Sequence, residues 1–148
     1  MATRALTLRS WSPAGREAVV SAAYALGALA IAGEGVVHVQ QYFSLYHDVS
    51  WIGPLFLVNG AACLAVIAGI AYAPTRLLAA LAGIVISAVA LGSLVISYGE
   101  GLFGWQEVGF RTPVALVLIV EVGAVILLSA ALAAKSALQP APRMTSIG

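Results

Sequence analysis

The chain has 148 residues, of which 61% are hydrophobic and only 9% are charged, and its net charge is +1. Soluble domains usually carry about 25% charged residues, so this composition predicts an integral membrane protein and excludes an ordinary soluble domain. The near-neutral charge also indicates that nucleic acid is not a partner.

The hydropathy of the chain predicts an all-α fold, an integral membrane four-helix bundle with antiparallel up-down-up-down topology. Each of four apolar segments is about 20 residues long, which is the length that crosses a bilayer. In chain order, we predict an N-terminal segment at 1–17, spans at about 18–37, 52–71, 77–97 and 113–134, and a flexible tail at 135–148. The connections 38–51 and 98–112 are polar and aromatic, whereas Pro74 leaves only a short turn between the second and third spans.

Basic residues are distributed unequally between the two sides of this predicted bundle. Six lie on the side of the termini and the short turn, and only Arg111 lies on the other side; the six are Arg4, Arg9, Arg16, Arg76, Lys135 and Arg143. Cytoplasmic loops carry an excess of Lys and Arg, so both termini are expected in the cytoplasm and the two long connections outside.

Polar side chains within the spans predict one cluster in the outer half of the bundle, formed by Glu34, Asn59, Ser93 and Glu121. At 1.5 Å per residue, Glu121 lies roughly 12 Å, Asn59 about 10 Å and Glu34 about 5 Å from the outer ends of their spans. A central acid costs about 2.5–3.5 kcal/mol, so each needs a partner, a proton or water. Two interpretations remain open, a functional site and a protonated packing contact.

Two histidines are weak candidates for a metal site. His38 follows Glu34 by four residues, so the carboxylate could orient the imidazole as it does for metal-bound histidines. His47 and Asp48 lie in the same outer connection. The sequence requires no cofactor, but a haem or a metal ion on His38, with or without His47, remains an alternative to ordinary interfacial side chains.

Aromatic residues are concentrated in the two outer connections, which predicts a contact surface there. Its members are Tyr42, Tyr46, Trp51, Phe103 and Trp105, with Glu107 beside them. Interfacial anchoring explains part of this excess, because Trp and Tyr are enriched at both membrane surfaces. A lid over the bundle or a docking surface explains why the excess is on one side.

Residues 52–60 (IGPLFLVNG) and 101–107 (GLFGWQE) resemble segments of small four-span membrane proteins of high-GC Gram-positive bacteria. The matching positions are Ile52, Gly53, Leu55, Phe56 and Asn59 in the first segment, and Gly101, Leu102, Phe103, Gly104 and Glu107 in the second, followed by Glu121. The resemblance implies the four-span architecture and a bacterial plasma membrane, and no established function.

Three functions remain open from the sequence, and no nucleophile–base arrangement or nucleotide motif favours an enzyme or a catalytic residue. The leading hypothesis is a non-enzymatic membrane module, an accessory subunit or self-associating bundle that binds a protein partner or a lipid-like molecule through its outer face. The second is proton-coupled transport of a small amphipathic or cationic solute with Glu34 and Glu121 as exchangeable acids. The third is a haem- or metal-binding redox module that uses His38.

Overall fold

The computed structural model describes residues 12–137, and within this range the chain is helical apart from its connections. The helices are α1 (Pro13–Gln41), the short π-helix η2 (Tyr42–Tyr46), α2 (Ile52–Ala71), α3 (Arg76–Gly99) and α4 (Thr112–Ala137). Four of the described helices are long and apolar enough to cross a membrane, α1 being counted together with η2. The predictions for residues 1–11 and 138–148 lie outside the described residues.

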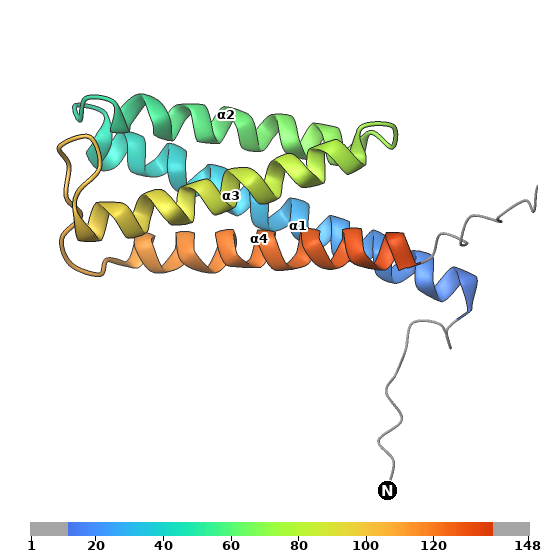
Figure 1. Cartoon of the computed structure of the whole chain (residues 1–148). Helices are drawn as coiled ribbons and strands as arrows, with labels where there is room; N and C mark the ends of the chain where they lie inside the picture. Colours follow the sequence, from blue (N-terminus) through green and yellow to red (C-terminus); the bar gives the residue numbers. More distant parts are fainter. Residues whose placement is uncertain (1–11, 138–148) are drawn as a thin grey trace, which may run out of the picture.

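The four long helices form a bundle in which consecutive helices run in opposite directions (Figure 1). Each helix packs against two neighbours: α1 contacts α4 and α2, and α3 contacts α2 and α4. The connections 42–51 and 100–111 lie together at one end, here called the long-loop end (Figure 1, left). The opposite end, here called the terminal end, carries the start of α1, the end of α4 and the turn 72–75.

The first helix is longer at both ends than the predicted span 18–37. Ser12 caps its N-terminus by accepting a hydrogen bond from the backbone N–H of Gly15, and Pro13 occupies the first turn, where a missing N–H costs nothing. At the other end helical structure continues to Tyr46, because residues 38–46 contain neither glycine nor proline. Nine of the fourteen residues of the predicted connection 38–51 therefore continue the helix. Similarly, α4 extends to Ala137, three residues into the predicted tail.

The half of the bundle nearer the terminal end has a closely packed apolar core. Leu128 of α4 is fully buried there, and Gly27 of α1 and Gly83 of α3 make room for it. A Cβ at Gly27 would lie 2.5 Å from Leu128 Cδ2, and one at Gly83 would lie 2.9 Å from Leu128 Cδ1. Small residues thus allow the close helix approach that replaces the hydrophobic effect as the source of packing in lipid.

The two connections at the long-loop end contain the only non-glycine residues of the described chain with positive φ. Residues 102–105 form a tight turn in which the backbone N–H and C=O groups of Leu102 and Trp105 are hydrogen-bonded to each other. Its central residues, Phe103 (φ 50°) and Gly104 (φ 82°), have the left-handed backbone of a type I′ turn. Trp51, which precedes α2, has φ 66°. Both aromatic side chains are exposed.

Candidate functional site

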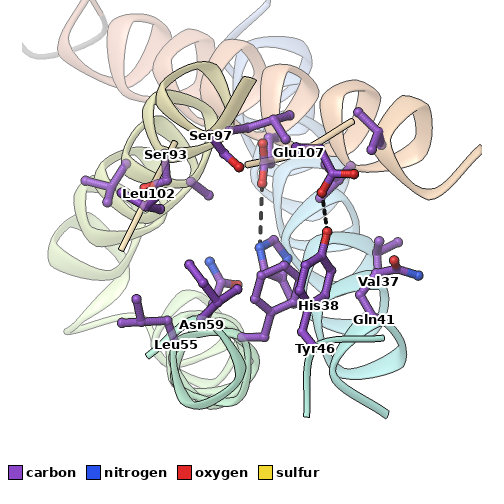
Figure 2. Close-up of a pocket in the computed structure, with 18 of the residues that line it drawn as sticks. Val37, His38, Gln41, Tyr46, Leu55, Asn59, Ser93, Ser97, Leu102 and Glu107 are labelled. Carbon is purple, nitrogen blue, oxygen red and sulfur yellow. Dashed lines mark hydrogen bonds and ion pairs between the residues drawn. The ribbon is translucent and has the colours of Figure 1, made fainter. Parts of the chain in front are cut away.

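A cavity of about 340 Å³ lies in the half of the bundle nearer the long-loop end. Its wall comes from all four long helices and from the connection before α4. Figure 2 shows Leu55 and Asn59 of α2 on one side of it and Ser93 and Leu102 on the other. This volume falls in the range of small-molecule sites, which are mostly apolar with a few convergent polar groups.

The cavity is bordered by exposed apolar side chains of α2 and α3. Leu55 and Val58 are 45% and 62% exposed, and Val85 and Val89 of α3 are 59% and 62% exposed, yet all four line the cavity. These side chains lie on the sides of helices that are long and apolar enough to span a membrane. The cavity therefore opens sideways, between α2 and α3, toward the surface that acyl chains would cover.

Glu34 is fully buried and both of its carboxylate oxygens accept hydrogen bonds from other helices. Asn59 Nδ2 donates to Oε1 at 3.1 Å and Ser87 Oγ donates to Oε2 at 2.6 Å. Cys63 Sγ in turn donates to Asn59 Oδ1 at 3.3 Å, which fixes the amide orientation. Three helices are thus joined through one carboxylate. Because α1 continues past residue 37, Glu34 lies about 10 Å from the end of the α-helix, deeper than the predicted 5 Å.

His38 lies one turn beyond Glu34 and faces Glu121 of α4. Its Nδ1 is 3.0 Å from the Glu34 carbonyl oxygen, which can only accept, so Nδ1 carries the proton. In the neutral ring, Nε2 then bears a free lone pair, and this atom lies 3.9 Å from Glu121 Oε1. His38 and Glu121 both line the cavity and are 8% and 1% exposed.

The cavity is covered at the long-loop end by Tyr46, Glu107 and Arg111. The Tyr46 hydroxyl donates to Glu107 Oε2, and Arg111 Nη2 donates to Glu107 Oε1 at 2.7 Å and to the Tyr46 oxygen at 2.9 Å. Figure 2 shows Tyr46 beside His38 with its hydroxyl directed to Glu107. Burial alone would lower the pKa of Arg111, but the hydrogen bond and charge of Glu107 raise it above its ordinary value. The guanidinium therefore stays charged and balances the buried carboxylate.

Aromatic rings connect this cover to the histidine below it. Tyr46 stacks on Phe56 with ring centroids 4.5 Å apart, and Phe56 in turn lies 4.9 Å from the His38 ring. Trp105 packs edge-on against Tyr46 at 5.5 Å. The wall of the cavity is thus held by contacts between α1, η2, α2 and the connection before α4.

Two buried polar atoms in the cavity wall have no hydrogen-bond partner within residues 12–137. They are the indole Nε1 of Trp105, a donor, and Oε2 of Glu121, an acceptor when ionised. A buried polar group without a partner costs about 1–3 kcal/mol. Such unpaired groups need an explanation. A bound molecule whose polar atoms form hydrogen bonds with both groups would provide one.

The structure brings some of the predicted site residues together and leaves others apart. Glu34 and Asn59 are hydrogen-bonded, and Glu121 reaches the same region through His38. Ser93 lines the cavity, but among the described residues its side chain makes no hydrogen bond to either acid. His47, the second predicted metal ligand, does not line the cavity. It pairs with Asp48 at 2.9 Å, and both side chains are well exposed.

The predicted outer-face residues separate into a buried and an exposed group. Tyr46 and Glu107 are buried, and Trp105 lines the cavity. Trp51 and Phe103 are 71% and 62% exposed. Tyr42 packs against its neighbours Phe43 and His47 rather than against the cavity wall.

Several residues of the site carried no distinct signal in the sequence. In the sequence, Ser87 and Cys63 are isolated residues of apolar segments, and Arg111 is the only basic residue on its side of the predicted bundle. A serine or cysteine in an apolar helix is ambiguous, because Ala-rich spans use both for packing. One hydrogen-bond partner of Arg111, Tyr46, is 65 residues away in the sequence, so their contact exists only in the folded chain.

Comparison of the chain with protein-family models, with curated proteins and with solved structures finds no match.

Proposed function

We propose that the protein is a non-enzymatic membrane module that binds one amphipathic, lipid-like molecule in the cavity between α2 and α3. The sideways opening carries this proposal, since a molecule that enters there arrives from the hydrocarbon of the bilayer. The apolar border formed by Val58 and Val89 suits its tail. The unpaired groups suit its polar part, because the indole N–H of Trp105 can donate to it and the carboxylate oxygen of Glu121 can accept from it.

The membrane and its sidedness are part of the same proposal. We place the protein in a bacterial plasma membrane with the terminal end in the cytoplasm. Among the described residues, Arg16 near the start of α1, Arg76 at the start of α3 and Lys135 near the end of α4 lie at that end, and Arg111, just before α4, lies at the other. This orientation follows the positive-inside rule. It puts the cavity in the outer half of the bilayer.

Proton-coupled transport with Glu34 and Glu121 is less well supported by the packing. A transported solute needs a path through the whole bundle, whereas the core nearer the terminal end is closed by Ile31, Val66 and Leu128. Binding on one side requires no such path. A ligand-binding module is therefore the simpler function for a cavity confined to half of the bundle.

Native mass spectrometry of the protein extracted from its own membranes in a mild detergent tests the proposal. We expect a non-covalent adduct of lipid-like mass on the wild type. Val89→Trp, which fills the opening, should lose the adduct. Val95→Trp should retain it, because Val95 is an equally apolar residue of α3, 70% exposed, that does not line the cavity.

Two results would contradict the proposal. One is a wild-type protein without any adduct, and the other is an adduct that Val89→Trp leaves unchanged. An added protein subunit in place of a small molecule would favour the alternative of an accessory subunit, with the exposed aromatics Trp51 and Phe103 as its contact surface.

A further inference from the structure

We infer that Glu34, His38 and Glu121 form a binding site for one divalent transition-metal ion, with zinc the best fit. Each offers one ligand atom, and these atoms all lie within 4.8 Å of one another. The three side chains come from α1 and α4 and are all buried. His38 and Glu121 also line the cavity of the proposed lipid-like ligand, and the metal would take the Glu121 carboxylate assigned there to the ligand's polar part, but the two proposals have separate tests.

The imidazole of His38 is oriented as a metal ligand. Metal-bound histidines almost always donate their second ring N–H to a carboxylate or a backbone carbonyl, which fixes the tautomer and the ring. Here Nδ1 donates to the Glu34 carbonyl oxygen at 3.0 Å, so the lone pair of Nε2 is directed away from its own helix. That lone pair faces Glu121, which is the second ligand.

The ligand atoms are close enough for side-chain rotation to bring them onto one zinc ion. Zn–N and Zn–O distances of about 2.1 Å in a tetrahedral site put two ligand atoms about 3.4 Å apart. The 3.9 Å between His38 Nε2 and Glu121 Oε1 would need to close by about 0.5 Å, and the widest of the three separations, up to 4.8 Å, by up to about 1.4 Å. The second oxygen of Glu121 is buried and unpartnered, which leaves this carboxylate free to rotate onto an ion.

Glu34 supplies the third ligand and is itself held in position. Asn59 and Ser87 each donate to one of its oxygens, and each carboxylate oxygen has a further lone pair for a metal ion. Such outer hydrogen bonds to a ligating carboxylate are a regular feature of metal sites. Three protein ligands leave a fourth position open, as in zinc sites that bind an exchangeable water or ligand.

The charge of the site also favours a dication. Two ionised carboxylates in a buried, low-dielectric region repel each other strongly, and a buried charge needs a partner. One divalent ion with two carboxylates and a neutral imidazole is electrically neutral. A haem iron fits less well, because the Glu121 carboxylate already lies 3.9 Å from Nε2, where the porphyrin would have to lie.

Titration with Co²⁺, a coloured substitute for Zn²⁺, tests the inference. The full chain is purified in a mild detergent through a tag that contains no histidine, stripped with a chelator, and titrated while visible absorption is recorded. We expect a saturable band at one Co²⁺ per chain that Zn²⁺ abolishes. His38→Ala and Glu121→Gln should lose it, and Ser87→Ala should weaken binding about 10–100-fold, as expected for a residue that orients a ligand.

His47→Ala is the matched control. His47 also pairs with an acid, Asp48, but both side chains are exposed, so its loss should leave the Co²⁺ band unchanged. The inference is overturned if the wild type shows no saturable band, if the band persists in both His38→Ala and Glu121→Gln, or if His47→Ala removes it. The wild-type titration and the nearly isosteric Glu121→Gln keep the test decisive even where His38→Ala fails to fold. The lipid-like adduct seen by native mass spectrometry is a separate readout, so either proposal can fail alone.

Discussion

The hydroxyl of Tyr46 donates a hydrogen bond to the carboxylate of Glu107, 61 residues further along the chain. This contact joins the end of the first helical segment to the connection before α4, and both residues are buried. It is the point at which the two connections of the long-loop end meet above the cavity. Its loss should therefore affect both the stability of the bundle and the cover of the cavity.

Tyr46→Phe should destabilise the protein by about 1–3 kcal/mol, because it leaves a buried carboxylate oxygen without its donor. The melting temperature in detergent can be followed through Cys63, which is the only cysteine and is 1% exposed, so that a thiol-reactive fluorophore labels it only on unfolding. Tyr72→Phe is the control, since Tyr72 is 63% exposed and lies at the terminal end. Equal melting temperatures for both variants would contradict the assigned role of the hydroxyl.

Ser87→Ala should lower stability by about 1–3 kcal/mol, since the 2.6 Å hydrogen bond to the fully buried Glu34 is lost. Ser93→Ala, six residues along the same helix, should change stability by less than about 0.5 kcal/mol. The same labelling of Cys63 measures both. If the two serines prove equivalent, the hydrogen bond from Ser87 contributes nothing to the fold.

Gly27→Ala should destabilise by about 1–3 kcal/mol through overpacking, because its Cβ would lie 2.5 Å from Cδ2 and 2.8 Å from Cγ of the fully buried Leu128. Gly92→Ala should instead be stabilising by up to about 1 kcal/mol, since alanine favours the helix. At Gly92 no atom lies within 4 Å of the added Cβ. A Gly27→Ala protein that melts at or above the wild-type temperature would show that α1 and α4 separate easily.

Phe103→Gly should raise stability by up to about 1.5 kcal/mol, because relief of about 1–2 kcal/mol of left-handed strain outweighs the roughly 0.5–1 kcal/mol entropic cost of introducing glycine. The strained residue is 62% exposed, so little packing is lost in return. Phe110→Gly is the control: Phe110 is 70% exposed in the same connection and does not have positive φ. There, glycine should lower stability by about 0.5–1 kcal/mol. A fall in melting temperature for Phe103→Gly would mean that its side chain stabilises the fold.

The four helices were predictable because hydropathy and length alone define an apolar span. The end of the first helix was not, since polar and aromatic residues such as Gln41 and Tyr46 are equally common in connections and in helix extensions. That one difference moved Glu34 deeper into the bundle and toward the level of Glu121. Depth along a helix depends on where the helix ends, so an error at one boundary shifts every residue measured from it.

The site was predictable only as a set of polar residues at similar depth. Which of them touch depends on how each helix is rotated about its axis, and uniformly apolar spans give no amphipathic face from which to read that rotation. Ser87 bonds to Glu34 while Ser93 does not, although both are serines of α3. His38 acquires its orientation from a backbone carbonyl, which no side-chain pattern encodes.

On the proposed function, the opening between α2 and α3 also determines which concentration governs binding. A molecule that enters from the side first partitions into the bilayer, where apolar solutes become far more concentrated than in water. Occupancy of the cavity then follows the mole fraction of the molecule among the surrounding lipids. Adding bilayer lipid that lacks the molecule should empty the cavity by the same mass action that fills it, while added volumes of buffer alone should not.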